Sequence, residues 1–152
     1  MDQGDTSVGR SELGVGASLG PRFAARLIDS FLIGVVSIYT ISIAGFAIGF
    51  TANMLSVAIV IGYFAVMESY TGRTIGKMAL RLKTVGPDGE NPSLETAFRR
   101  NIWYLLGLLP YFGGIAEIAA VIYVAVTISQ SPMNIGWHDL FAGGTRVVRV
   151  ER

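Results

Sequence analysis

The 152-residue sequence contains no cysteine and a single histidine, His138. Without a thiol the chain has no disulfide, no thiolate metal site and no cysteine nucleophile. A lone imidazole with no second histidine or cysteine also falls short of the ligand set that a dedicated zinc centre requires. We therefore expect neither a metal nor another cofactor.

Charged residues are scarce as well, at 15% of the chain against 51% hydrophobic residues. The apolar residues form long runs: residues 27–50 hold one charge, Asp29, and residues 101–130 hold one, Glu117. Residues 51–67 hold none. Each run has the roughly 17–25 residues that a helix needs to cross a bilayer. We predict an all-α membrane protein, a small transmembrane bundle.

The predicted membrane helices span residues 23–44, 54–70 and 101–129. The third apolar segment is kinked or broken at Pro110, because proline removes a helical hydrogen bond. It is either one bent span or a short interfacial or re-entrant helix followed by a span. These alternatives place the C-terminus on opposite sides of the membrane, and the sequence leaves both open.

The loop at residues 71–100 is rich in basic side chains, so the positive-inside rule places it and the N-terminus in the cytoplasm. Its basic residues are Arg73, Lys77, Arg81, Lys83, Arg99 and Arg100, and its acidic ones are Asp88, Glu90 and Glu95. Residues 75–82 are predicted to form a short amphipathic element at the headgroups, with the basic side chains on the wet side.

Residues 1–20 are rich in Gly and Ser and are predicted to be a disordered cytoplasmic tail. The transmembrane domain then covers residues 21–150, with a C-terminal tail from residue 130 to residue 152. Strand-like residues 81–85 and 145–150 could pair as a β-hairpin-like element if both lie in the cytoplasm.

Ionisable side chains inside a bilayer cost about 2.5–3.5 kcal/mol each and are therefore candidate functional residues. Arg22, Arg26 and Asp29 fall on one face of the first helix. Glu117 stands in the third apolar segment. For the first three residues a topological interpretation is equally open, in which the arginines anchor the helix end among headgroups and neutralise Asp29.

Other polar residues are weaker candidates. Glu68, near the cytoplasmic end of the second helix, is predicted to be interfacial and to pair with Arg73. His138 and Asp139 are adjacent in the tail and could form a metal or proton site. Lys77 belongs to a GRTIGK stretch that lacks P-loop spacing, which favours a structural or lipid-headgroup role. No catalytic triad or HExxH pattern is present, so we expect no enzyme.

Three blocks of the sequence together resemble the RDD family, which is named for one arginine and two aspartates. In PRFAARLID, Arg22 and Asp29 match the family's arginine and first aspartate, and Arg26 is additional. TGRTIGKMALRLKTV resembles the family's Gly- and Thr-containing loop and following strand. In WHDLFAGGTRVV, Asp139 matches the second aspartate, while one extra glycine could shift the register of the last strand. The resemblance covers residues 20–150.

The resemblance implies a multi-pass protein of a bacterial or archaeal cell membrane, suspected of transport, with some members associated with sodium/proton exchange. Two hypotheses follow. In the first, Asp29, Glu117 and Asp139 bind a cation or proton in turn, in a path that needs an oligomer. In the second, the protein is a non-transporting accessory or assembly subunit, and the Arg and Asp residues form a structural clamp. The expected partners are the lipid bilayer and further copies or a larger membrane complex, not nucleic acid.

Overall fold

The computed structural model describes residues 15–44 and 50–150. In chain order the elements are α1 (Leu19–Ala44), α2 (Phe50–Thr71), α3 (Ile75–Ala79), β1 (Leu82–Val85), α4 (Leu94–Asn101), the 3-10 helix η2 (Ile102–Leu108), α5 (Gly113–Gln130), α6 (Trp137–Phe141) and β2 (Arg146–Arg149). The chain is mostly helical with one small two-stranded sheet, in agreement with the predicted class.

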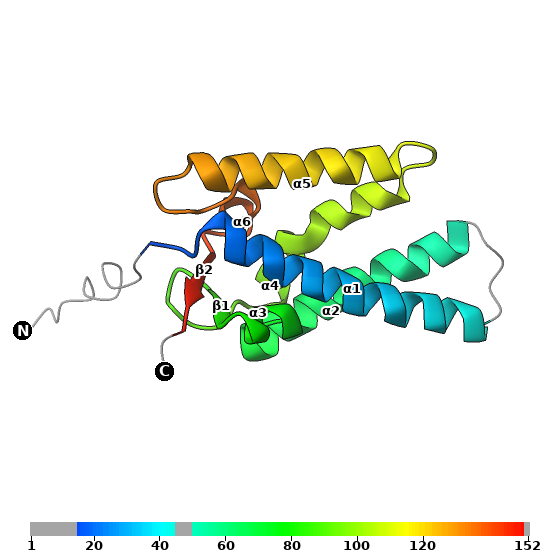
Figure 1. Ribbon diagram of the computed structural model, residues 1–152, viewed down its shortest axis with the longest axis horizontal. Coiled ribbons are helices and arrows are strands. Elements are labelled where there is room, and N and C mark those ends of the chain that lie inside the picture. The colour runs from blue at the N-terminus through cyan, green and yellow to red at the C-terminus, as the bar shows by residue number, and fades with distance from the viewer. Residues whose placement is uncertain (1–14, 45–49, 151–152) are drawn as a thin grey trace, which may run out of the picture.

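The helices form two antiparallel pairs (Figure 1). One pair is α1 and α2, and the other is α5 with the continuous leg made by α4 and η2. The turn between η2 and α5 lies at one end of the molecule. The short elements α3, α6, β1 and β2 gather at the opposite end (Figure 1), where they bring segments far apart in the sequence together.

Two of the described helices are long and apolar enough to cross a membrane, namely residues 51–71 of α2 and the whole of α5. Large apolar side chains of α5 face outward, with Ile115, Ile118 and Ile122 between 58% and 68% exposed. An outward apolar face of this extent is typical of a helix that contacts lipid or another apolar surface. The chain therefore has the helices expected of a membrane protein.

The third apolar segment is broken, so the interpretation as two separate elements holds. η2 ends at Leu108, Pro110 stands in the turn, and Tyr111 adopts a positive φ of 63°. A Cβ on Gly113 would collide with the backbone of Gly107, so the two elements cross closely there. At about 2.0 Å per residue the seven residues of η2 advance only about 14 Å. η2 alone is therefore about half as long as a hydrocarbon core of about 30 Å is thick, and α4 lengthens the same leg.

β1 pairs antiparallel with β2, from Leu82 opposite Arg149 to Val85 opposite Arg146. The predicted pairing of residues 81–85 with residues 145–150 is therefore confirmed. The extra glycine did not prevent it, because Gly143 and Gly144 both adopt positive φ, at 93° and 89°, in the turn before β2. Glycine takes this conformation without the strain that a Cβ would add.

The predicted disordered tail is wrong for residues 15–20, while residues 1–14 lie outside the described part. The Ala17 N–H donates to the Val147 carbonyl at 2.7 Å, and the Gly16 N–H donates to the Met133 carbonyl at 3.1 Å. Ala17 also packs in a small core with Ala25 and Leu82. These contacts hold residues 15–20 against β2, and α1 begins at Leu19.

Candidate functional site

A group of buried ionisable side chains lies where α1, α2, α3, α4 and α6 meet. Its members, together called the charge cluster below, are Arg22, Glu68, Lys77, Arg100, His138 and Asp139. Each is less than 10% exposed. With His138 neutral, three cations face two carboxylates, so the charge cluster carries a net positive charge.

Asp139 is the centre of one half of the charge cluster. Its Oδ2 lies 2.6 Å from Nη2 of Arg22, and its Oδ1 lies 2.9 Å from Nη2 of Arg100. Oδ2 also accepts the Gly136 N–H at 3.0 Å. Burial raises the pKa of Asp139, but the positive charges, Arg100 foremost, outweigh burial and hold this pKa well below its usual value. The carboxylate is therefore ionised and joins α1, α4 and α6.

His138 lies beside this ion pair, with Nε2 3.4 Å from Oδ1 of Asp139 and 3.5 Å from Nη2 of Arg22. Burial lowers the pKa of His138 to about 3, against the opposing attraction of Asp139. The imidazole is therefore neutral at neutral pH. No group of three or more His, Asp or Glu side chains that could hold a metal ion occurs among residues 15–44 and 50–150.

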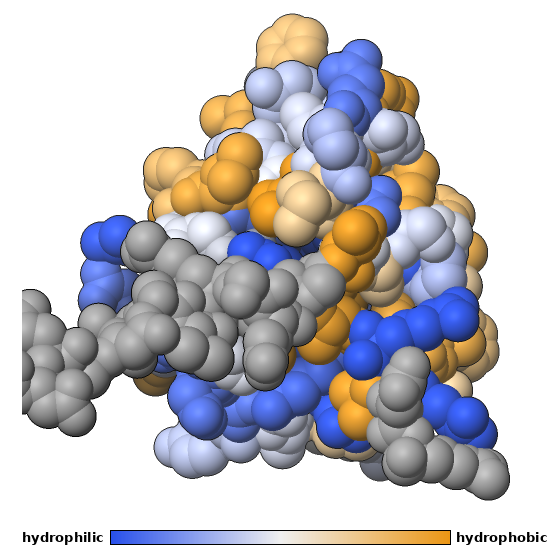
Figure 2. Space-filling model, turned by 90° about the vertical axis from the view of Figure 1, so that its left-hand side faces the viewer, coloured by the Kyte–Doolittle hydropathy of each residue, from blue (hydrophilic) through white to orange (hydrophobic). Residues whose placement is uncertain are grey.

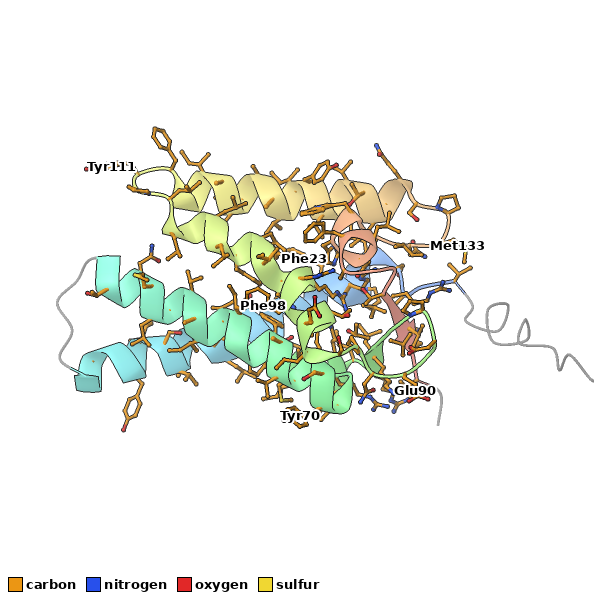
Figure 3. All side chains as sticks on the ribbon, turned by 180° about the vertical axis from the view of Figure 1, so that it is seen from behind. Phe23, Tyr70, Glu90, Phe98, Tyr111 and Met133 are labelled. Carbon is orange, nitrogen blue, oxygen red and sulfur yellow. The ribbon has the colours of Figure 1, made fainter. Side chains whose placement is uncertain are left out.

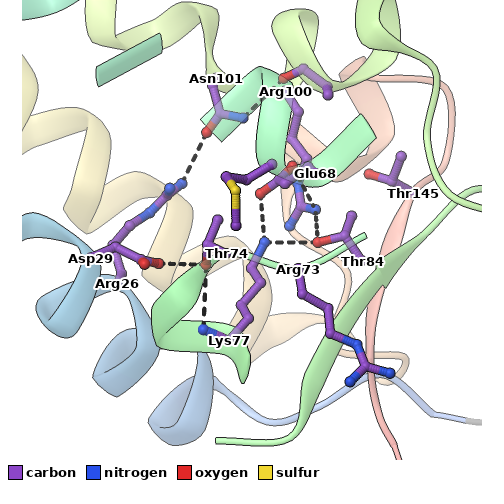
Figure 4. Close-up of polar contacts among 12 residues, drawn as sticks. Arg26, Asp29, Glu68, Arg73, Thr74, Lys77, Thr84, Arg100, Asn101 and Thr145 are labelled. Carbon is purple, nitrogen blue, oxygen red and sulfur yellow. Dashed lines mark hydrogen bonds and ion pairs between the residues drawn. The ribbon is translucent and has the colours of Figure 1, made fainter. Parts of the chain in front are cut away.

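Glu68 is the centre of the other half (Figure 4). Its carboxylate lies 2.5 Å from Nζ of Lys77 and 3.5 Å from Nη1 of Arg100. The Thr84 hydroxyl accepts from both cations, at 2.7 Å and 2.8 Å. Burial lowers the pKa of Lys77 to about 7, although the Glu68 charge opposes this shift. Arg100 contacts both carboxylates and so links the two halves.

Two predictions about this half are wrong. Glu68 pairs with Lys77 and Arg100, not with Arg73, and its side chain is buried in the protein, 1% exposed. Lys77 points into the protein instead of lying on the wet side of α3, because Glu68 and Thr84 compensate its charge there.

In the sequence, Arg100 is one of several basic residues of a loop, and its place in the site was not predicted. The helical spacing of α4 could have identified Arg100 as a buried residue. Ala97, Arg100 and Asn101 share one face of α4 and are all buried. Arg99, one position earlier, is exposed and makes an ordinary surface pair with Glu95.

Asp29 lies beside the charge cluster and is 1% exposed. Its Oδ1 accepts from the Tyr63 hydroxyl at 2.8 Å and the Gly76 N–H at 2.7 Å. Its Oδ2 accepts from the Thr74 hydroxyl at 2.6 Å. All three donors are neutral, so the predicted neutralisation of Asp29 by the two arginines of α1 is wrong. Asp29 instead fastens α1 to α2 and α3.

Arg26 makes different contacts from the other cations. Its Nη2 donates to Oδ1 of Asn101 at 3.3 Å, and its guanidinium carbon stands 4.0 Å from the centre of the Phe64 ring. This is a cation–π geometry. In the described part of the chain no carboxylate oxygen lies within 4 Å of Arg26 as an ion-pair partner.

Glu117 does not join the other candidates. It stands near the start of α5, at the end that carries the turn from η2, and its carboxylate lies against Gly107. The structure thus brings together Arg22, Glu68, Lys77, His138 and Asp139, places Arg26 and Asp29 beside them, and leaves Glu117 near the opposite end.

The fold and the charge cluster define a small helical membrane protein whose polar residues tie the start and the end of the chain together. The model of the RDD family matches residues 16–143, and the chain belongs to this family. Neither a curated protein nor a solved structure matches the chain. Arg22, Asp29 and Asp139, which carried the family resemblance in the sequence, all lie in or beside the charge cluster.

Proposed function

We propose that the protein is a non-transporting accessory or assembly subunit of a membrane complex, in which the charge cluster is a structural clamp. The observation that carries this proposal is the pairing of Asp139. Arg22 of α1 and Arg100 of α4 both bind its carboxylate, which is 0% exposed. A carboxylate held in this way offers no open position to an exchanging cation. Removing either partner would leave a buried charge without compensation.

The proposed topology is multi-pass in a bacterial or archaeal cell membrane. α1, α2 and α5 would span it, and the leg made by α4 and η2 would be the fourth crossing, so that the turn at Tyr111 reaches the far side. Both described chain ends lie with the sheet at one end of the molecule (Figure 1), which agrees with an even number of crossings. Hydrophilic residues gather in the lower half of this end, below hydrophobic ones (Figure 2). Lys83 lies in β1 and Arg81 directly precedes it, so both belong to the end that carries the sheet, and by the positive-inside rule this would be the cytoplasmic end.

Reconstitution of the protein into liposomes distinguishes the structural clamp from a transport function. Purified wild type is placed in liposomes under a sodium or a proton gradient, beside Asp29→Asn and the matched control Asp88→Asn, whose carboxylate is in an exposed turn. We expect no gradient dissipation above protein-free liposomes. We also expect Asp29→Asn, but not Asp88→Asn, to reduce the yield of monodisperse protein. Flux through wild type, abolished in a fully folded Asp29→Asn variant, would overturn the clamp.

Cation or proton transport is the second candidate, and Glu117 is the observation that favours it. Its carboxylate is partly buried against Gly107 and has no ion-pair partner within 4 Å among the described residues. Transport by this route predicts flux that Glu117→Gln abolishes without loss of folded protein. We propose no enzymatic role.

A further inference from the structure

A cavity of about 90 Å³ lies between α1 and α5, next to the charge cluster. One water molecule needs only about 10–15 Å³ of such space, so the cavity has room for a larger group. Its ionisable lining residues are Arg22, Arg26, Asp29, Lys77, Arg100 and His138. Asp29 already accepts three hydrogen bonds. Three of the four cations pair with Glu68 or Asp139 behind the cavity wall, so the cations exceed the carboxylates of this region by one positive charge. This excess of positive charge favours an anion over a cation.

Four side chains that line the cavity carry a buried nitrogen that has no hydrogen-bond partner among the described residues: three are N–H donors, and the fourth, Nδ1 of His138, donates or accepts according to the tautomer. These donors are Nη1 of Arg26, Nε of Arg100 and Nε1 of Trp103. A buried donor left unpaired costs about 1–3 kcal/mol. Arg26 also lacks a carboxylate partner, unlike the other three cations. A ligand rich in acceptor oxygens would satisfy these donors once the side chains turn toward the cavity, and it would compensate the charge of Arg26.

The rest of the cavity wall is apolar. Phe23 of α1 and Val121, Val124 and Ala125 of α5 contribute to it. Phe23 is 48% and Val121 is 39% exposed, whereas Lys77 and Arg100 are at most 8% exposed. The apolar residues therefore form the mouth and the buried cations form the floor. The mouth opens between two helices that present apolar side chains outward, where a hydrocarbon chain would lie.

We propose that this cavity binds the phosphate group of an anionic lipid, with the acyl chains leaving between α1 and α5. Arg26 is the principal charged contact, and Arg100 and Trp103 supply the other donors. Guanidinium groups bind phosphate oxygens through charge-assisted hydrogen bonds, which are stronger than neutral ones. The proposal is independent of the clamp, because it uses the donors that the clamp leaves unpaired.

Native mass spectrometry of the delipidated full chain in detergent tests this site. The probes are dioleoylphosphatidylglycerol, its zwitterionic phosphatidylcholine counterpart, and inorganic phosphate. Wild type is compared with Arg26→Gln and with Arg99→Gln, which removes the same charge from an exposed site. We expect wild type to prefer the anionic lipid and Arg26→Gln to bind it about tenfold more weakly, the loss of one charged hydrogen bond. Arg99→Gln should bind as wild type does.

A second variant tests the site even if Arg26→Gln does not fold. Ala125→Phe fills the apolar side of the cavity without changing any charge, and it should also weaken binding of the lipid. Equal losses in Arg26→Gln and Arg99→Gln, or no binding of any probe, would overturn the site. Inorganic phosphate that binds as tightly as the lipid, unaffected by Ala125→Phe, would overturn the lipid as the source while supporting the phosphate contact.

Discussion

At the scale of single residues, Asp139 is the most deeply buried member of the charge cluster, and it contacts two cations. Two guanidinium groups reach its carboxylate from helices early and late in the chain, and all three side chains are buried. Burying a charge is unfavourable, and here the opposite charges and their hydrogen bonds compensate one another. Loss of the carboxylate would therefore expose the full cost of burying Arg22 and Arg100.

Asp139→Asn should destabilise the protein by about 3–5 kcal/mol, the usual result of removing one partner from a buried pair. The thermal midpoint in detergent, followed by size-exclusion chromatography after heating, measures this loss. Glu95→Gln is the control, because it breaks an exposed ion pair with Arg99 and should cost no more than about 1 kcal/mol. Equal midpoints for the two variants would show that the charge cluster does not hold the fold together.

His138 should make stability depend on mild acid. Its pKa in the folded protein is about 3, below its ordinary value of 6.5, because burial disfavours the charged imidazole. As the pH falls below 6.5 the unfolded chain binds a proton that the folded chain does not, so stability decreases with decreasing pH. At about 1.4 kcal/mol per pH unit, the loss between pH 7 and pH 5 is about 2 kcal/mol.

His138→Gln removes this titration and should therefore lose less stability than wild type between pH 7 and pH 5. Thermal midpoints at the two pH values check the difference. Titration of Asp139 does not affect this comparison of stabilities. Because its pKa is lowered, its effect on stability falls at pH values below the ordinary range of aspartate. The same pH loss in both proteins would mean that another group titrates in this window.

The sequence identified the residues of the site better than their partners. Arg22, Asp29 and Asp139 stood out because of their charge and their sequence blocks. Helical spacing placed Arg22 and Asp29 on one face of α1, which suggested that they neutralise each other. In the structure Arg22 instead reaches Asp139, 117 residues away. Local periodicity cannot predict such a pair, because long side chains reach across elements that only tertiary packing brings together.

At the scale of elements, the contact between α1 and α3 depends on Gly76. A Cβ at this position would collide with the carbonyl group of Ala25 and crowd the Asp29 side chain. The absence of a side chain lets the Gly76 N–H reach the Asp29 carboxylate at 2.7 Å. α3 therefore packs against α1 through backbone atoms, and the Asp29 hydrogen bonds require that close approach.

Gly76→Ala should separate the two helices and cost about 1–3 kcal/mol or more, as overpacking does in a well-packed core. Gly62→Ala is the matched control, since a Cβ at Gly62 meets no atom within 4 Å. It should leave stability unchanged or raise it slightly, because alanine favours helix over glycine. Thermal midpoints of the two variants check the contrast, and a harmless Gly76→Ala would contradict the close approach.

Element types were largely predictable, whereas the course of the third apolar segment was not. The long apolar runs predicted α1 and α2. Ser93 caps α4 by accepting the Thr96 N–H at 3.2 Å, and serine is a common residue at this position of a helix. Pro110 indicated a break, yet proline permits either a kink or a turn. The choice depends on the close crossing of Gly107 and Gly113, which is a tertiary contact.

At the scale of the whole molecule, the two ends have different character. Tyr111 lies at the tip of the turn between η2 and α5, and Glu90 and Met133 lie toward the other end (Figure 3). Tyr111 is 99% exposed. If the helices cross a membrane as we propose, these two ends face opposite compartments.

Single cysteines test this arrangement on a background free of native thiols. Tyr111→Cys and Asp88→Cys each place one thiol at an exposed turn, at opposite ends of the molecule. In intact cells, a membrane-impermeant maleimide should label Tyr111→Cys before lysis and Asp88→Cys only after it. Labelling of both variants from outside would exclude the proposed topology.

The Arg22–Asp139 pair also bears on how the chain is made. At roughly 5–20 residues per second, synthesis of the 117 residues between the partners takes roughly 6 to 23 s. During that time α1 is already available for insertion while Arg22 has no carboxylate to bind. In a nascent or truncated chain that ends before Asp139, Arg22 therefore has no carboxylate to compensate its charge at the membrane. Quality-control proteases could use this exposed charge to distinguish unfinished copies from complete ones.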